Sequence, residues 1–240
     1  IRNYKKLATM GDSVAQYNLA LAYESGKGVS QDYVKAAMWY QKAADQGVCE
    51  AQYNLGVFYL NGIGVTQSNT TAIVWWDKSA NQGYVNAQYN LALAYEFGKG
   101  VSQNYVKAVM WYQKAADQGD SGAQYKLGYF YANNQGVSQD YVKAVMWYQK
   151  AADQGHSEAQ LNLGVLYSRG YGVSQDYVKA AMWYQKAADQ GNPTSQFYLG
   201  FLYEFGEGVS KDIYTAKKWY QKAADQGNNQ AKHRIDSLNS

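Results

Sequence analysis

Small and aromatic residues recur at helical spacing in the stretch DYVKAAMWYQKAADQG, residues 32–47. Its apolar positions lie three and four residues apart and are Ala36, Trp39, Tyr40, Ala43 and Ala44. This spacing predicts a short helix that gathers bulky and small side chains on one face. A helix of about four turns is marginal by itself in water, so it needs neighbours to pack against.

The ends of this stretch carry residues that favour helix boundaries. Asp32 can accept hydrogen bonds from the free N–H groups of the first turn, and Gly47 can enter the left-handed region without a Cβ penalty. A fixed 36-residue interval separates the copies, which indicates a repeat protein. The copies are Asn104–Gly119, Asp140–Gly155 and Asp176–Gly191 and, in looser form, Ser68–Gly83 and Asp212–Gly227.

A second kind of helix is predicted ahead of each copy, for example at Ser13–Ser25, where Ala15, Leu19, Ala22 and Tyr23 have helical spacing. A small residue follows the leucine in every copy: Ala20, Gly56, Ala92, Gly128, Gly164 and Gly200. A glycine inside a helix costs roughly 1 kcal/mol relative to alanine, so we expect a bulky side chain of the partner helix to fill the space. A glycine–x–glycine motif then ends this first helix, and each repeat is predicted as first helix, tight loop and second helix.

These repeats predict an all-α protein, an α/α solenoid that extends over residues 1–240 as a single domain. Six repeats begin at Gly11, Gly47, Gly83, Gly119, Gly155 and Gly191. Residues 1–10 match the end of a second helix, so we expect the natural chain to continue upstream, and the cut repeat is a candidate for self-association. Residues 227–240 are predicted to cap the array with a helix near Asn229–Leu238. The recurring tryptophans are expected between helices in the core: Trp39, Trp75, Trp111, Trp147, Trp183 and Trp219.

Composition and motifs argue against several classes of function. A net charge of +3 is too weak to indicate nucleic-acid binding, and no apolar run approaches the ~18 residues of a membrane span. The lone Cys49 excludes an internal disulfide framework. His156 and His233 occupy different places in different repeats, so we expect plain surface histidines, with no metal site and no cofactor. Catalytic motifs such as H-E-x-x-H and S-x-x-K are absent.

The combination A-x-x-x-L-G/A-x-x-Y, G-x-G-V and D-x-x-x-A-x-x-W-Y-x-x-A-A at a 36-residue period resembles the Sel-1-like repeat, a relative of the tetratricopeptide repeat. The resemblance covers about Tyr4 to Leu238. It implies a right-handed superhelix of antiparallel helix pairs that acts as a bacterial adaptor, in the periplasm, secreted or in the cytoplasm. It also offers an alternative, because members of a cysteine-rich branch bind penicillin or hydrolyse β-lactams. The cysteine pairs of that branch are missing here. A structural spacer is a third option.

The first helices differ among repeats at four positions, whereas the second helices are nearly identical. Matching positions line the concave groove of tetratricopeptide repeats, so the resemblance implies a groove for a protein or an extended peptide. The alternative is that these positions merely tolerate variation. Several of the varying residues are large and apolar, which favours the groove. The four series begin at Val14, Leu21, Glu24 and Ser25.

Asparagines and tyrosines add a further pattern to the first helices. Asparagine offers both a donor and an acceptor to a peptide backbone, and the resemblance implies the same role. The alternative is that the asparagines tie one repeat's helix to the backbone of the next. The candidate partner-binding residues are Tyr17, Asn18, Leu21, Glu24, Tyr53, Asn54, Leu60, Tyr89, Asn90, Leu93, Phe97, Lys126, Tyr129, Asn162, Arg169, Tyr198, Phe201 and Phe205.

Overall fold

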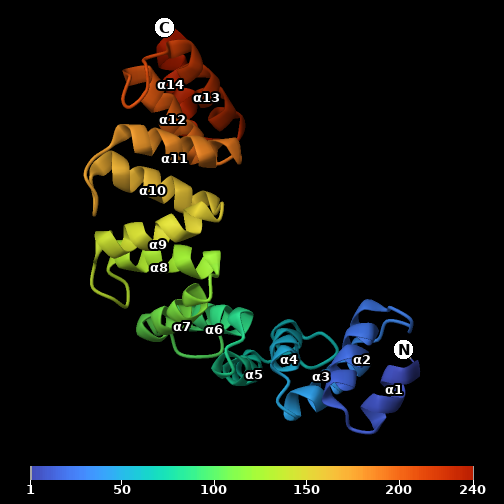
Figure 1. Cartoon of the computed structure of the whole chain (residues 1–240). Coiled ribbons are helices and arrows are strands. Elements are labelled where there is room, and N and C mark those ends of the chain that lie inside the picture. Colours follow the sequence, from blue (N-terminus) through green and yellow to red (C-terminus); the bar gives the residue numbers. More distant parts are fainter. Residues whose placement is uncertain (1, 240) are drawn as a thin grey trace. The chain divides into compact units, whose positions relative to one another are not determined.

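A computed structural model describes residues 2–239. Within this range the chain consists of fourteen α-helices joined by short loops, without a strand (Figure 1). The helices are α1 (Arg2–Thr9), α2 (Ser13–Ser25), α3 (Tyr33–Asp45), α4 (Cys49–Asn61), α5 (Asn69–Asn81), α6 (Val85–Phe97), α7 (Tyr105–Asp117), α8 (Ser121–Asn133), α9 (Tyr141–Asp153), α10 (Ser157–Arg169), α11 (Tyr177–Asp189), α12 (Pro193–Phe205), α13 (Ile213–Asp225) and α14 (Asn229–Asn239). The predicted all-α solenoid is confirmed, and the last helix extends one residue beyond its expected end.

The helices belong to two compact units, an N-terminal unit (Ile1–Gln118) and a C-terminal unit (Gly119–Ser240). Within each unit, the first helix of a repeat packs on its own second helix, and that second helix packs on the next first helix. In the N-terminal unit, for example, α2 packs on α3 and α3 on α4. Each helix inside a unit therefore buries two sides against its neighbours in sequence, whereas α1, α7, α8 and α14 each have one such neighbour in their unit.

The predicted boundary residues lie at the starts and ends of the helices, as expected. The Asp32 carboxylate accepts a hydrogen bond of 3.0 Å from the backbone N–H of Lys35. Asn134, the residue in place of the first loop glycine in the fourth repeat, is left-handed with a φ of 56°. Gly64 has a φ of 64°, and a Cβ there would overlap the backbone of Tyr33. This second loop glycine is needed both for its backbone conformation and for its close approach to the preceding repeat.

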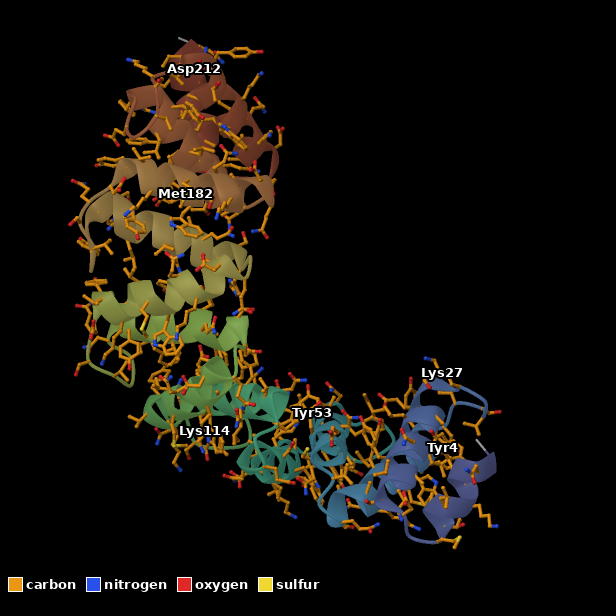
Figure 2. All side chains as sticks on the ribbon, viewed as in Figure 1. Tyr4, Lys27, Tyr53, Lys114, Met182 and Asp212 are labelled. Carbon is orange, nitrogen blue, oxygen red and sulfur yellow. The ribbon has the colours of Figure 1, made fainter. Side chains whose placement is uncertain are left out.

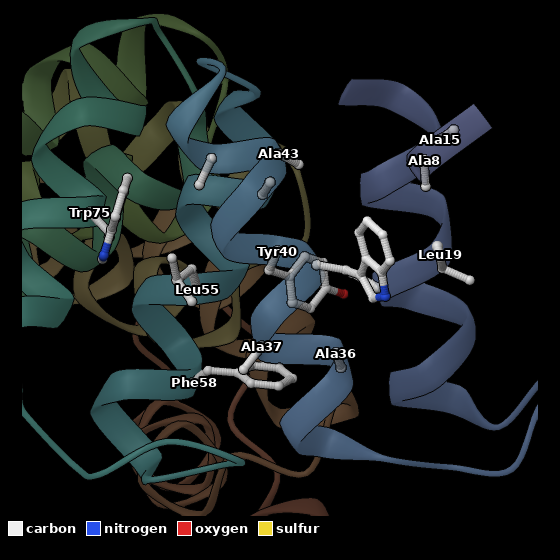
Figure 3. Packing of buried hydrophobic residues seen from close by; sticks show 14 residues of the cluster. Ala8, Ala15, Leu19, Ala36, Ala37, Tyr40, Ala43, Leu55, Phe58 and Trp75 are labelled. Carbon is white, nitrogen blue, oxygen red and sulfur yellow. The ribbon is translucent and has the colours of Figure 1, made fainter. Parts of the chain in front are cut away.

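The core lies between successive helices and contains the predicted apolar face. Figure 3 shows Tyr40 of α3 between Leu19 of α2 and Leu55 of α4, with Phe58 beside it. The rings of Tyr40 and Phe58 meet edge to face with 5.3 Å between their centroids. Because alanines surround these large side chains, for instance Ala36, the helices can approach closely.

Five of the six recurring tryptophans are buried as predicted. A lysine of the same helix lies over the ring of each tryptophan; the Nζ of Lys114, which is labelled in Figure 2, lies 4.3 Å from the centre of the Trp111 ring. Trp219 packs against the core cluster that contains Leu199, as predicted, but it is only partly buried. Its helix α13 is followed by α14 but by no further second helix within residues 2–239, so one side of Trp219 lacks a cover.

The small residues after the recurring leucine have the role that the sequence predicts. A Cβ on Gly56 would overlap the indole ring of Trp76 in α5. A Cβ on Gly128 would lie 2.5 Å from the ring of Tyr148 in α9. The Trp76 indole N–H also donates to the backbone carbonyl of Tyr53, at 3.2 Å, which fixes the ring over the glycine.

This contact predicts a specific pair of variants. Gly56→Ala should lower the free energy of unfolding by about 1–3 kcal/mol, because the added methyl group displaces the Trp76 ring. The double variant Gly56→Ala, Trp76→Tyr reproduces the pair found at Ala20 and Tyr40 in the first repeat, so it should recover part of that loss. Urea unfolding of the two single variants and the double variant measures the coupling. Strictly additive losses would contradict the proposed ring–methyl conflict.

Candidate functional site

Four cavities lie between neighbouring repeats: three have equivalent walls, and the one lined mainly by α2 spans two of these equivalent places. We name them A (α1–α3), B (α4–α6), C (α8–α10) and D (α10–α12), with volumes of about 730, 220, 350 and 280 Å³. A and B lie in the N-terminal unit, and C and D lie in the C-terminal unit. In each case the walls come from the first and second helices of one repeat and from the following repeat. The geometry of one repeat thus generates a row of similar hollows within each unit.

Most of the predicted partner-binding residues line these cavities. Cavity A contains Asn18, Leu21 and Glu24. Cavity B contains Leu60, Asn90, Leu93 and Phe97. Cavity C contains Tyr129, Asn162 and Arg169. Cavity D contains Arg169, Tyr198 and Phe201.

The remaining predicted residues lie outside the cavity walls. Tyr17 packs on Tyr40, with 5.9 Å between ring centroids, and Tyr53 packs on Tyr84, with 5.2 Å. Tyr89 packs on Tyr112 of α7, with 5.6 Å between ring centroids. These three tyrosines therefore contribute to packing. Also outside the walls are Asn54, the half-buried Lys126 and the exposed Phe205.

The position of Glu24 forms the floor of each cavity and differs among repeats. Glu24 accepts a hydrogen bond from the Tyr40 hydroxyl, and Glu204 accepts one of 2.7 Å from the Tyr220 hydroxyl. Burial raises the pKa of Tyr40, and its hydrogen bond to Glu24 raises that pKa further. Other repeats carry leucine, alanine or serine at this position: Leu60, Ala132 and Ser168. The floor is thus acidic, apolar or small according to the repeat.

The asparagine positions make polar contacts with the preceding repeat. The Asn54 side chain interacts with the hydroxyls of Tyr17 and Tyr40 and lowers both pKa values against the larger effect of burial. Asn162 has the same relation to Tyr148. These contacts favour the structural alternative for Asn54 and Asn162, although they run through side chains rather than the backbone. A role of the asparagines in binding stays a prediction.

In the C-terminal helix α14, an arginine occupies the repeat position that Asn54 and Asn162 hold in other first helices. Arg234 binds the Glu204 carboxylate through two hydrogen bonds, 2.8 Å from Nε and 2.7 Å from a terminal nitrogen. This bidentate pair secures α14 to α12. It also satisfies a buried carboxylate, whose charge would otherwise be costly inside the protein.

Sequence reasoning missed the walls contributed by second helices and loops. Tyr33, Tyr141 and Tyr177, near the starts of their second helices, each line a cavity. The loop position does so as well, through Ile63, Lys99, Tyr171 and Glu207. This loop position varies as strongly as the first helices do, so comparison of the loops among repeats could have identified it.

Comparison with known proteins identifies the repeats. The family model described as Sel1 repeat matches residues 13–48, 49–84, 85–120, 121–156, 157–192 and 193–228. The chain belongs to the Sel1 repeat family. Each matched Sel1 repeat begins two residues after the predicted start, which is a difference of register only.

Two solved structures support the Sel1 assignment. A protective antigen present in uropathogenic Escherichia coli strains, c5321, is 39% identical to this chain, with a TM-score of 0.94. That match covers 98% of this chain and 50% of the other, so this chain spans half the length of that relative. A Sel1 repeat protein from Oxalobacter formigenes is 32% identical, with a TM-score of 0.80, over 94% of this chain and 88% of the other. A comparison with curated proteins gives no match.

The Sel1 array offers few groups for catalysis within the described residues 2–239. Groups of three or more His, Cys, Asp or Glu side chains that could hold a metal ion are absent there. Cys49 is half-buried, and burial raises the pKa of its thiol, which disfavours the reactive thiolate. None of the helices in this range is long and apolar enough to cross a membrane.

The expectation that His156 is a plain surface residue was wrong. Its Nδ1 accepts a hydrogen bond of 3.3 Å from the backbone N–H of Ala159 and so caps α10. Its ring stacks on Tyr125, with 4.6 Å between centroids. Burial lowers the pKa of His156, against the opposing charges of Glu158 and Asp120. The neutral ring is therefore the form that the folded protein favours.

This lowered pKa predicts a pH-dependent stability. The unfolded chain binds the proton of His156 near pH 6.5, whereas the folded chain binds it only at lower pH. Stability should be full above about pH 6.5 and fall as the pH drops below it. His156→Asn, which introduces the N-cap found at Asn192, should remove part of the loss between pH 7.5 and 5.5. Melting temperatures with the same pH dependence in both proteins would contradict this prediction.

The Arg234–Glu204 pair predicts a second stability effect. Arg234→Asn should lower the free energy of unfolding by about 1.5–3 kcal/mol, because hydrogen bonds to a charged group are lost. The exposed neighbour Lys232 provides a control, and Lys232→Asn should change it by less than ~0.5 kcal/mol. Urea unfolding measures both variants. Equal effects of the two substitutions would show that the bidentate pair does not stabilise α14.

Proposed function

We propose that this chain is a non-catalytic scaffold that binds an extended segment of a partner protein along its cavities. Sel1 repeat proteins are generally protein-interaction scaffolds. The observation that carries the proposal is the recurrence of one kind of cavity, at equivalent places in B, C and D, with walls that contain the varying positions. A repeat protein that binds a specific partner needs both features: constant residues that hold the helices in place, and varying residues that contact the partner.

The exposed aromatic residues support the same proposal. Tyr129 and Phe201 occupy one repeat position, line cavities C and D, and are 37% and 36% exposed. Tyrosine and phenylalanine supply large contact areas at low entropic cost, and they are enriched at protein interfaces. Side chains of this kind at a cavity rim favour a protein or peptide over a nucleic acid, for which the net charge of +3 is weak.

The β-lactam-directed alternative has no comparable support. The chain contains a single cysteine, Cys49, and burial raises the pKa of its thiol. Self-association through the first helix stays a prediction. It is supported by exposed apolar side chains on and just after α1, namely Tyr4, Leu7 and Met10.

The proposal is tested by a variant that reduces the aromatic rim without altering the fold. The double variant Tyr129→Val, Phe201→Val introduces the residue found at Val57 and Val165, so each repeat keeps a side chain that the array already accommodates. Affinity for a partner captured from a lysate of the source organism should fall about tenfold or more, as expected for aromatic interface anchors. Surface plasmon resonance with that partner measures the change.

A matched control lies on the second helices. Met146 and Met182 are 43% and 45% exposed, line none of cavities A to D, and Met182 is labelled in Figure 2. Met146→Val, Met182→Val introduces the residue found at Val74 and should leave both capture and melting temperature unaltered. Equal losses of capture in the control and the rim variant, or no loss in either, would refute binding along the cavities.

A further inference from the structure

The side chain of Arg169 lies between cavities C and D and has no hydrogen-bond or ion-pair partner among the described residues. Arg169 ends α10, its side chain is exposed, and it lines both cavity C and cavity D. The other repeats carry a neutral residue at this position: Ser25, Asn61, Phe97, Asn133 and Phe205. A cation at this place is therefore particular to the C-terminal unit.

Aromatic rings form the walls on both sides of Arg169. In cavity C, Tyr141 and Tyr171 stack with 4.9 Å between their centroids. In cavity D, Tyr184 and Tyr198 stack with 5.2 Å between theirs. Cavities of about 350 and 280 Å³ with such walls can each accept one apolar side chain.

The charges that face these cavities are few. Arg169 is the charged residue of cavity C, and cavity D adds Glu207 at the loop position. The positive charge reaches the floor of cavity D, because Arg169 lowers the pKa of Tyr184 against the larger effect of burial. The rim shared by cavities C and D is thus positive. The negative charge of Glu207 lies at the opposite wall of cavity D, in the following repeat.

The spacing of the cavities restricts the ligand's backbone. Cavities C and D are one repeat apart, and the first helices α8 and α10 are in contact. Packed helices lie about 8–10 Å apart. A polyproline II segment rises about 3.1 Å per residue with three residues per turn, so side chains three residues apart project to the same side at about 9 Å. This conformation matches the spacing of the two cavities.

We propose that the C-terminal unit binds an extended acidic segment, with apolar side chains three residues apart in cavities C and D and an Asp or Glu between them on Arg169. The planar guanidinium can bind a carboxylate through two parallel hydrogen bonds. The two aromatic cavities supply apolar area on either side of that pair. This inference rests on the proposed function, whose partner class it specifies.

The test uses the full chain and an array of acetylated, amidated peptides. Each peptide carries two apolar residues (Leu, Ile, Pro, Phe or Tyr) three positions apart, with Glu, Gln or Lys between them. Matched peptides place the apolar residues two or four positions apart. Fluorescence anisotropy at about 0.15 M salt gives the dissociation constants, so that screening is comparable with physiological conditions.

We expect the best Glu peptide to bind at least tenfold more tightly than its Gln counterpart and to lose affinity when the spacing changes. Arg169→Asn introduces the residue found at Asn61 and Asn133, and it should abolish the preference for Glu without a change in melting temperature. Glu207→Gln introduces the residue found at Gln135, and it should strengthen binding of the Glu peptide because it removes a competing negative charge.

Several results would overturn the inference. These are equal binding of Glu and Gln peptides, a preference for Lys, a preference for Glu that survives Arg169→Asn, or an absence of peptide binding. In each case the rim variant Tyr129→Val, Phe201→Val decides the broader question separately. If that variant still loses the captured partner, the scaffold function stands and only the acidic ligand is refuted.

Discussion

The structure depends on one steric complement, an aromatic ring of a second helix seated over a small residue of the first helix. The pairs Gly56–Trp76, Gly128–Tyr148, Gly164–Tyr184 and Gly200–Tyr220 all have this form, because a Cβ on the glycine would overlap the ring. Close seating brings the two helix backbones together and lets the alanines around them pack. In these four repeats it also explains the glycine in a helix interior, where it costs roughly 1 kcal/mol relative to alanine; Ala20 and Ala92 hold the same place in the other two repeats.

The same ring connects the packing of the helices to the lining of the cavities. Its buried part fills the helix interface. Where the ring is a tyrosine, its hydroxyl meets the varying position of the first helix, as at Glu24 in cavity A, Ser168 in cavity D and Glu204 in the last repeat. A change at this one position alters the floor without moving the helix, because the ring remains held by the small residue beneath it. The array can therefore vary the lining of its cavities while its frame stays constant. The asparagine of the next repeat interacts with the same tyrosine hydroxyl, as Asn54 does with Tyr40. This shared contact explains why the sequence left both a structural and a binding role open for the asparagines.

Periodicity was sufficient to predict the helices, their boundaries and the residues that form the core. It also identified the cavity-lining positions of the first helices, because variation and apolar character coincide there. It could not identify the cavity walls on the second helices. Tyr141 and Tyr177 lie at a position that is tyrosine in most repeats, so variation among repeats does not mark it. Departures from the periodic pattern were predicted less well. His156 occupies the N-cap place that Asp12, Asp120 and Asn192 hold in other repeats, but histidine is not among the residues that usually cap a helix, so its capping role was missed. The partial burial of Trp219 depends on its neighbours in space and does not follow from its place in the repeat.

Similarity among repeats thus determines the fold, and differences among them determine the lining of each cavity. The second helices are nearly identical even at exposed positions such as Val34 and Met38, so they offer a partner little to distinguish one repeat from another. The first helices and loops give each cavity its own charge and shape, from the acidic floor at Glu24 to the positive rim at Arg169. Under the proposed function, a ligand that contacts cavities C and D is positioned by Arg169, because the other repeats carry a neutral residue at that position. Register along a repetitive scaffold is in this way set by a few non-repetitive side chains.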